Sequence, residues 1–389
     1  EYNHKINPPT ERIPNIMAGS SFGTIFKITT WGESHGKGIG VIIDGCPAGI
    51  PLNAEWVQAY LNRRKPGQTR YATPRKENDT VAIESGLFEG QTTGTPISMA
   101  VYNETQRSAD YSEIAGYYRP GHADFTFDAK YGFRDYRGGG RSSGRETIGR
   151  VAAGAVACAL LKELGISVTA YTKSIGTISA APSSFAPDIL SSERDASPLF
   201  MPGREASDAA EEYLKDTMKQ FDSAGGIIEC IISGMPAGVG DPVFEKLDAN
   251  LAKAVVSIGA VKGFEIGSGF SCAQANGSSN NDAFLGIRNG RAKKATNHAG
   301  GTLGGISDGS DIVLRAAVKP TPSIFREQQT ILRDASPVRV QVKGRHDPVI
   351  VPRAVVVVEA MAALTVTDAL LVNMSARMDR IREFYRPQA

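Results

Sequence analysis

The sequence predicts an α+β fold, in which helices and strands mix without a regular strand–helix–strand alternation. The clearest helix spans residues 146–164, where small apolar side chains recur at helical spacing and Gly165 follows as a terminating residue. Short apolar runs at residues 40–44 and 227–233 are typical of buried strands. Because no dinucleotide-binding GxGxxG follows a strand, a doubly wound sheet is disfavoured.

The elements follow one another along the chain. Residues 22–29 alternate like a strand, and residues 40–44 end at a Gly-Cys-Pro turn. Asn53 is expected to cap a helix that runs to Arg64. The strands expected after this helix are residues 80–87, 96–102, 227–233 and 312–318. The helices expected after it are residues 146–164, 209–223, 243–257 and 359–384.

The most apolar segment is residues 354–372, but Glu359 and Asp368 interrupt it. Each charge would cost roughly 2.5–3.5 kcal/mol at a bilayer centre. A buried helix preceded by a short strand is therefore expected, with no membrane partner. Residues 1–16 are polar and carry three prolines, so they are interpreted as a flexible or cloning-derived extension to a single domain over residues 17–389.

The composition excludes several classes of protein. Lys and Arg number 43 against 41 Asp and Glu, and this balance gives no global attraction to nucleic acid or membranes. The four cysteines are scattered without a CxxC pair, so a metal site is not expected. We expect a cytoplasmic protein whose cysteine thiols are reduced and buried. The four cysteines are Cys46, Cys158, Cys230 and Cys272.

Three of the five histidines have settings that suit an acid–base role. His35 lies between glycines in GESHG, His122 follows Arg-Pro-Gly, and His346 lies between Arg345 and Asp347. Histidine is the natural general acid near neutral pH. Each could equally be a loop histidine, exposed in a turn or held by a neighbouring carboxylate.

Arginine is concentrated in two glycine-containing stretches. The first spans residues 63–75, and the second spans residues 134–150 around Gly138, Gly139 and Gly140 and runs into a helix start. Guanidinium groups bind phosphate and carboxylate in a bidentate manner, and a helix N-terminus favours anions. RNA binding is the rival interpretation, disfavoured because aromatic residues are not interleaved with the arginines. The residues alone therefore indicate an enzyme for a small phosphorylated anion.

Taken together and in order, the motifs resemble the chorismate synthase family. The resemblance covers nearly the whole chain from about Gly19 and rests on GESHGKGIGVIIDGCPAGIPL, RRKPGQTRYATPR, FEGQTTGTPI, RPGHADFTF, RGGGRSSGRET, NHAGGTLGGIS, KPTPS and GRHDP. It implies a single domain with helices layered between antiparallel β-sheets, assembled as a homotetramer. It also implies the anti-1,4-elimination of phosphate from 5-enolpyruvylshikimate 3-phosphate to give chorismate, the last common step of the shikimate pathway for aromatic amino acid biosynthesis.

The resemblance also implies a site with reduced FMN as a cofactor that is not consumed. The implied substrate contacts are Arg64, Arg70, Arg119 and Arg145. The implied flavin contacts are Arg141, Ser142, Ser143, Gly259, Ala260, Gly304, Lys319, Pro320, Thr321, Pro322, Ser323 and Arg345. Family descriptions also give Arg64 and Arg70 as NADP contacts.

Four residues have implied catalytic roles. His35 would protonate the departing phosphate and His122 the reduced flavin near N1, although these two roles could be exchanged. Ser34 and Asp347 would form a relay that accepts a proton from flavin N5. Gly259 departs from the family pattern, because many members have Asn or Pro there. The family pattern covers nearly the whole chain and no additional flavin-reductase domain is evident, so an external flavin reductase is expected as the source of reduced FMN. The rival interpretation is a flavin-dependent oxidoreductase with net electron transfer.

Overall fold

The computed structural model describes residues 19–67, 71, 78–103, 113–288, 291–342 and 347–386. Two five-stranded sheets, antiparallel throughout, dominate the fold. The first has the order β1 (Ser21–Phe22), β2 (Lys27–Gly32), β3 (Gly38–Asp44), β7 (Ile97–Tyr102) and β4 (Val81–Ile83). The second has the order β11 (Val261–Ile266), β16 (Ile312–Val318), β10 (Gly226–Ser233), β8 (Ser167–Ile175) and β9 (Ile178–Ser179).

Helices and small hairpins complete the described chain. The helices are α1 (Ala54–Arg64), α2 (Asp124–Tyr131), α3 (Thr147–Glu163), α4 (Pro187–Asp195), α5 (Arg204–Lys219), α6 (Leu247–Val256), α7 (Gly277–Asn280), α8 (Val351–Val372) and α9 (Met378–Phe384). The short 3-10 turns are η2 (Glu113–Gly116), η3 (Gly140–Ser142), η4 (Gly144–Glu146), η5 (Gly269–Gln274) and η6 (Asn373–Ser375). The two-stranded hairpins are β5 (Leu87–Phe88) with β6 (Gln91–Thr92), β12 (Phe284–Arg288) with β13 (Arg291–Lys294), β14 (Thr302–Leu303) with β15 (Ile306–Ser307), and β17 (Glu327–Ile331) with β18 (Pro337–Gln341).

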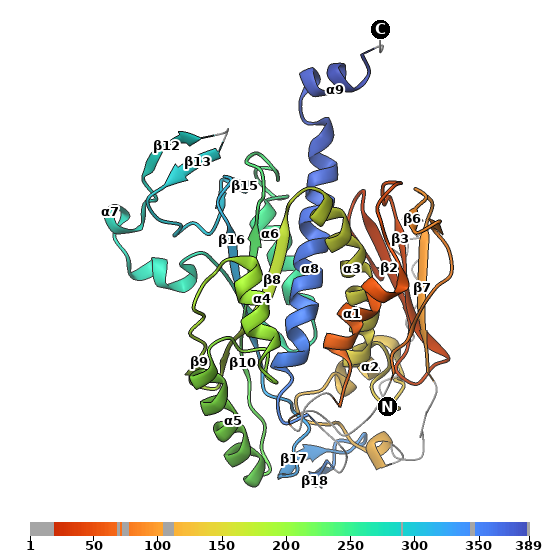
Figure 1. Ribbon diagram of the computed structural model, residues 1–389. Helices are drawn as coiled ribbons and strands as arrows, with labels where there is room; N and C mark the ends of the chain where they lie inside the picture. The colour runs from red at the N-terminus through yellow and green to blue at the C-terminus, as the bar shows by residue number, and fades with distance from the viewer. Residues whose placement is uncertain are drawn as a thin grey trace, which may run out of the picture.

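The helices α1, α3, α6 and α8 lie between the two sheets (Figure 1). Helices α1 and α3 pack toward the first sheet, and α8 and α6 pack toward the second. This arrangement confirms the predicted α+β class and the layering of helices between antiparallel sheets. Among the described residues, the buried apolar side chains of both sheets belong to one continuous cluster.

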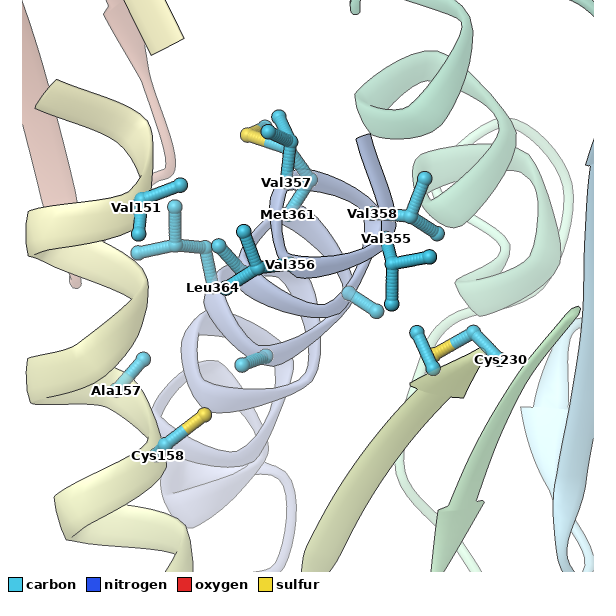
Figure 2. Packing of buried hydrophobic residues seen from close by; sticks show 14 of the residues in the cluster. Val151, Ala157, Cys158, Cys230, Val355, Val356, Val357, Val358, Met361 and Leu364 are labelled. Atoms are coloured by element: carbon cyan, nitrogen blue, oxygen red, sulfur yellow. The ribbon is translucent and has the colours of Figure 1, made fainter. Parts of the chain in front are cut away.

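The α3–α8 contact forms the centre of this core. Gly154 of α3 permits a close approach, because a Cβ placed on it would lie 2.3 Å from the Cβ of Ala360. Figure 2 shows Val151 and Cys158 of α3 facing α8, while Val355 and Val358 of α8 point to the opposite side, toward Cys230 of β10. Helix α8 therefore contacts both halves of the core, which requires an apolar surface nearly all round.

One carboxylate is buried within this apolar layer. Glu359 of α8, with 3% of its side chain exposed, accepts hydrogen bonds from Arg63 at 2.5 and 3.0 Å, from Arg194 at 3.1 Å and from the Ala170 backbone at 3.0 Å. Burial alone would raise the pKa of Glu359, but the charges of Arg63 and Arg194 outweigh it and hold the pKa below its ordinary value. The cluster ties α1, α4 and β8 to α8.

The segment Val351–Ser375 is long and apolar enough to cross a membrane by length and composition. In the most apolar part of this segment, 72% of the residues are buried inside the fold, so the helix is a core element of this structure. The helix starts at Val351, so the short strand expected before it is wrong. Valine has low helix propensity, and packing against both sheets outweighs this preference.

Other expectations need smaller corrections. Residues 22–29 do not form one strand, because residues 23–26 turn and the carboxylate of Asp368 accepts the backbone N–H groups of Thr24, Ile25 and Phe26 at 2.7–2.9 Å. Helix α5 begins five residues earlier than expected, at Arg204, and α6 four residues later, at Leu247. The C-terminal helix ends at Val372 and resumes as α9. Cys272 is exposed, whereas the other three cysteines are buried as predicted.

Candidate active site

A cleft of about 1280 Å³ lies where the N-terminal halves of α3 and α8 meet the C-terminal end of α6. Its volume exceeds the roughly 300–1,000 Å³ usual for one small ligand, which leaves room for more than one ligand. The sequence-predicted residues that line it are Ser34, Arg64, Arg119, His122, Arg141, Ser142, Ser143, Arg145, Gly259, Ala260, Lys319, Thr321, Pro322, Ser323 and Asp347. Arg70 and Arg345 lie outside the described residues, as does His346.

Positive charge dominates the cleft. Among the described lining residues, the carboxylates are Glu146 and Asp347. The lining cations are Arg64, Arg119, Arg141, Arg145, Arg150, Lys253, Lys319 and Arg353. Clefts lined by one sign of charge concentrate ligands of the opposite sign. The predicted preference for a small anion is therefore supported by the arrangement of these side chains.

One wall of the cleft is apolar, and the sequence interpretation missed it. Ile350, Ala354, Val357 and Met361 line the cleft from the start of α8, at spacings of four, three and four residues. Such spacing places side chains on one face of a helix. The run of valines at residues 355–358 masked this periodicity. An apolar strip facing a cationic rim suits a ligand with a flat apolar body and anionic groups.

His122 contacts the Lys-Pro-Thr-Pro-Ser segment that follows β16. Its Nε2 lies 2.8 Å from the hydroxyl of Ser323, and both residues line the cleft. The ammonium group of Lys319 donates to the carbonyl of Gly121 at 2.7 Å. These contacts join two motifs about 200 residues apart. Pro320 belongs to the same segment but does not line the cleft.

His35 lies just behind the cleft wall rather than on it. The residue is 8% exposed, and Gly138 packs directly against its ring. Asn103, which the sequence interpretation missed, donates to the carbonyls of Ser34 and Gly36 at 3.3 and 2.8 Å. The turn that carries His35 is therefore fixed by a residue about 70 positions later in the chain.

We expect Gly138→Ala to lower turnover while flavin affinity is retained. A methyl group on Gly138 would lie 2.3 Å from Cε1 of His35, and φ at this position is +66°, which only glycine adopts easily. Displacing a catalytic group by ~1 Å costs on the order of 10²-fold in rate. The measurement is kcat beside the Kd of oxidised FMN. Gly132→Ala is the matched control, because φ there is also positive, at +79°, while a methyl meets no atom within 4 Å and the residue does not line the cleft. Equal kcat in the two variants would contradict the expected role of His35.

Arg64 is buried at the end of α1, with 2% of its side chain exposed. Its guanidinium donates to Asp79 Oδ2 at 2.9 Å, to the Thr147 hydroxyl at 3.0 Å and to the Gly144 carbonyl at 3.0 Å. Burial, with the nearby charge of Arg353, lowers the pKa of Arg64 to about 10. The side chain is therefore charged at neutral pH and fixed in position, while it still lines the cleft.

Two further predicted arginines are held by protein groups. Arg119 makes a bidentate pair with Asp124, whose carboxylate also accepts the Arg119 backbone N–H. Burial would raise the pKa of Asp124, but the hydrogen bonds and charge of Arg119 outweigh it and lower the pKa. Arg141 reaches β2, donating to the Thr30 hydroxyl at 2.7 Å and the Gly32 carbonyl at 3.2 Å. Ser142 and Ser143 follow Arg141 along the cleft wall.

Asp347 pairs with Arg353, another residue that the sequence interpretation missed. Arg353 also donates from Nε to the backbone carbonyl of Arg64 at 3.1 Å. One guanidinium thus positions the predicted base Asp347 against the end of α1. The local sequence gives no signal for this role, because Arg353 lies within an apolar helix.

The remaining predicted flavin contacts lie in two different parts of the structure. Ala260 has φ of +73°, an unusual value for alanine, and its carbonyl accepts the backbone N–H of Lys319 at 3.0 Å. Beside it, Thr321 lines the cleft, and its buried hydroxyl has no hydrogen-bond partner among the described residues. Gly304 lies in the β14–β15 turn and does not line the cleft.

Comparisons with known proteins agree with one another. The family model described as chorismate synthase matches residues 26–371. The chain is 68% identical to a chorismate synthase of Lachnoclostridium phytofermentans and 62% identical to one of Agathobacter rectalis, in each case over 95% of this chain and all of the relative. A crystal structure of a chorismate synthase superposes with a TM-score of 0.73 at 31% identity, covering 93% of this chain and 96% of that one. With the cationic cleft and its ordered motifs, these matches show that the chain belongs to the chorismate synthase family.

Proposed function

We propose that this chain converts 5-enolpyruvylshikimate 3-phosphate into chorismate and inorganic phosphate. In this elimination the bond between C3 and the phosphate oxygen breaks and a hydrogen leaves C6, so there is no net redox change. The observation that carries the proposal is the cleft, in which eight cationic side chains face two carboxylates over a volume of about 1280 Å³. A substrate with carboxylates and a phosphate fits this charge pattern.

The cleft also has the features that reduced FMN requires. The apolar strip of α8 suits an isoalloxazine ring, and Lys319 suits a phosphate. The unsatisfied hydroxyl of Thr321 offers a hydrogen-bonding group. When bound, reduced FMN would supply electron density that assists departure of the phosphate. We assign its contacts to Arg141, Ser142, Ser143, Gly259, Ala260, Lys319, Thr321, Pro322 and Ser323, which line the cleft. For Pro320 and Gly304, which do not line it, and for Arg345, outside the described residues, the assignment rests on the family resemblance alone.

The chain's own residues would bind, orient and handle protons. Arg64, Arg119 and Arg145, with Arg70, would hold the substrate anions. We assign to His35 the protonation of the departing phosphate. His122, which is hydrogen-bonded to Ser323, would hold a proton beside the flavin. Ser34 and Asp347 would take up the proton released, with Arg353 orienting the Asp347 carboxylate.

The wider setting is part of the proposal. The enzyme would act as a homotetramer in the cytoplasm, in aromatic amino acid biosynthesis. It would receive reduced FMN from an external flavin reductase that could draw on NADPH. The cofactor would return to its starting state after each turnover, so no nicotinamide donor would be consumed in proportion to product.

One anaerobic assay tests this function. The full chain is mixed with dithionite-reduced FMN and 5-enolpyruvylshikimate 3-phosphate, and chorismate and phosphate are measured together. We expect equal amounts of both products, many turnovers per flavin and no reaction with oxidised FMN alone. Product that appears only in step with oxidation of the flavin would instead indicate an oxidoreductase, and no product would overturn the proposal.

A further inference from the structure

We propose that Asp79 is a positioning residue that holds two substrate-binding arginines in register, an inference that rests on the proposed function. The carboxylate of Asp79 is fully buried, with 0% of its side chain exposed. Its Oδ2 accepts a hydrogen bond from Arg64 Nη1 at 2.9 Å, and its Oδ1 forms an ion pair, without hydrogen-bond geometry, with Arg145 Nη2 at 3.2 Å. Asp79 does not line the cleft, whereas both arginines do.

The backbone at Asp79 is held in an unusual conformation. Its φ is +46°, in the left-handed region that costs a non-glycine residue free energy. The side chain of Gln58 on α1 fixes it, because Nε2 donates to the Asp79 carbonyl at 3.2 Å and Oε1 accepts the Val81 N–H at 2.9 Å. Helix α1 thus supplies both the clamp on Asp79 and, at Arg64, one of its ionic partners.

The electrostatic need for this carboxylate follows from burial. Arg64 and Arg145 have 2% and 12% of their side chains exposed, so water screens their mutual repulsion poorly. A shared carboxylate lets both cations approach one ligand anion without being driven apart. A surface residue would not serve, because an exposed ion pair contributes little.

Asp79 also lies at the middle of a continuous chain of contacts. Arg145 donates to Asn103 Oδ1 at 2.7 Å, and Asn103 fixes the turn that carries His35. On the other side, Arg353 links the carbonyl of Arg64 to Asp347. The predicted acid and the predicted base are therefore connected through the two arginines that Asp79 joins.

The test is Asp79→Asn, which keeps the size of the side chain and removes its charge. Asparagine tolerates left-handed φ, so the backbone at this position is retained. We expect the Kd of 5-enolpyruvylshikimate 3-phosphate, measured by calorimetry, to rise by about tenfold or more, as is typical of weakened charge-assisted hydrogen bonds. The Kd of oxidised FMN without substrate should stay within about threefold of the parent value. If Asp79→Asn does not fold, Asp79→Gly relieves the backbone strain and carries the same expectation.

Glu359→Gln is the matched control, because Glu359 is also a buried carboxylate shared by two arginines, but its partners Arg63 and Arg194 do not line the cleft. A merely structural role of Asp79 would make both variants alike, with lower stability and unchanged substrate affinity, and that result would overturn the inference. A parent chain that fails to bind the substrate would instead overturn the proposed function. Inorganic phosphate then serves as the probe, and equal phosphate affinity in parent and Asp79→Asn would overturn the inference too.

Discussion

His122→Ala is expected to lower turnover by about 10²–10⁴-fold, the usual contribution of a positioned general acid or base. His122 lines the cleft, where its Nε2 lies 2.8 Å from the Ser323 hydroxyl, and its side chain is only partly buried, outside the apolar core. The variant should therefore fold normally and bind both ligands. The measurement is kcat with reduced FMN at saturating substrate, together with a thermal unfolding curve.

Two variants make this result specific. His122→Gln retains a group that can hydrogen-bond to Ser323 but cannot transfer a proton near neutral pH, so it should be as impaired as His122→Ala. His298→Ala is the matched control, because His298 lies outside the cleft and contacts the carbonyl of Asn280 at 3.0 Å. Near-parental turnover in His122→Gln would remove His122 from proton transfer and leave it a positioning contact of Ser323.

Glu359→Ala is expected to lower the free energy of unfolding by about 3–5 kcal/mol, because it removes the buried carboxylate shared by two largely buried guanidinium groups, of which one keeps Asp195 as a second partner. Those groups belong to Arg63 and Arg194, with 18% and 6% of their side chains exposed. The measurement is urea unfolding at neutral pH. Glu327→Ala is the control, since Glu327 pairs with Arg339 on the surface, and its unfolding free energy should hardly change.

The stabilisation by Glu359 also has a predictable pH dependence. The pKa of this carboxyl is held below its ordinary value, so its contribution is present above the unfolded pKa of about 4.3 and is lost as pH falls through the lower folded pKa. The parent should thus lose stability below about pH 4–5 more steeply than Glu359→Ala. Parallel curves for the two proteins in this range would contradict the ionised state of Glu359 in the fold.

Local sequence signals predicted the secondary-structure elements whose ends are determined by neighbouring residues, such as helix caps. Asn53 caps α1 as expected, its Oδ1 accepting the Trp56 N–H at 2.8 Å. The start of α8 could not be predicted in this way, because four consecutive valines favour a strand locally. Contacts with α3 and β8 decide their conformation. The turn at residues 23–26 depends on Asp368, more than 340 residues away.

The candidate site likewise contains residues that local motifs predicted and residues that only long-range contacts reveal. Glycine-rich and arginine-rich motifs pointed to the cleft wall, and fifteen of the predicted residues line it. Asp79, Asn103 and Arg353 were missed, because each acts by joining segments that are distant in sequence. An isolated aspartate or asparagine carries no signal of its long-range partners. The apolar strip of α8 was hidden for another reason, since that helix is apolar on nearly every face.

The cleft draws its walls from Gly19 at one end of the described chain to Met361 near the other. Unfolding of either sheet would therefore dismantle the binding site, so ligand affinity and global stability are thermodynamically linked. A ligand present at a hundred times its Kd adds about 2.7 kcal/mol to the free energy of unfolding when it binds only the folded state. The supply of substrate and flavin in a cell would thus set how often this chain opens to proteases.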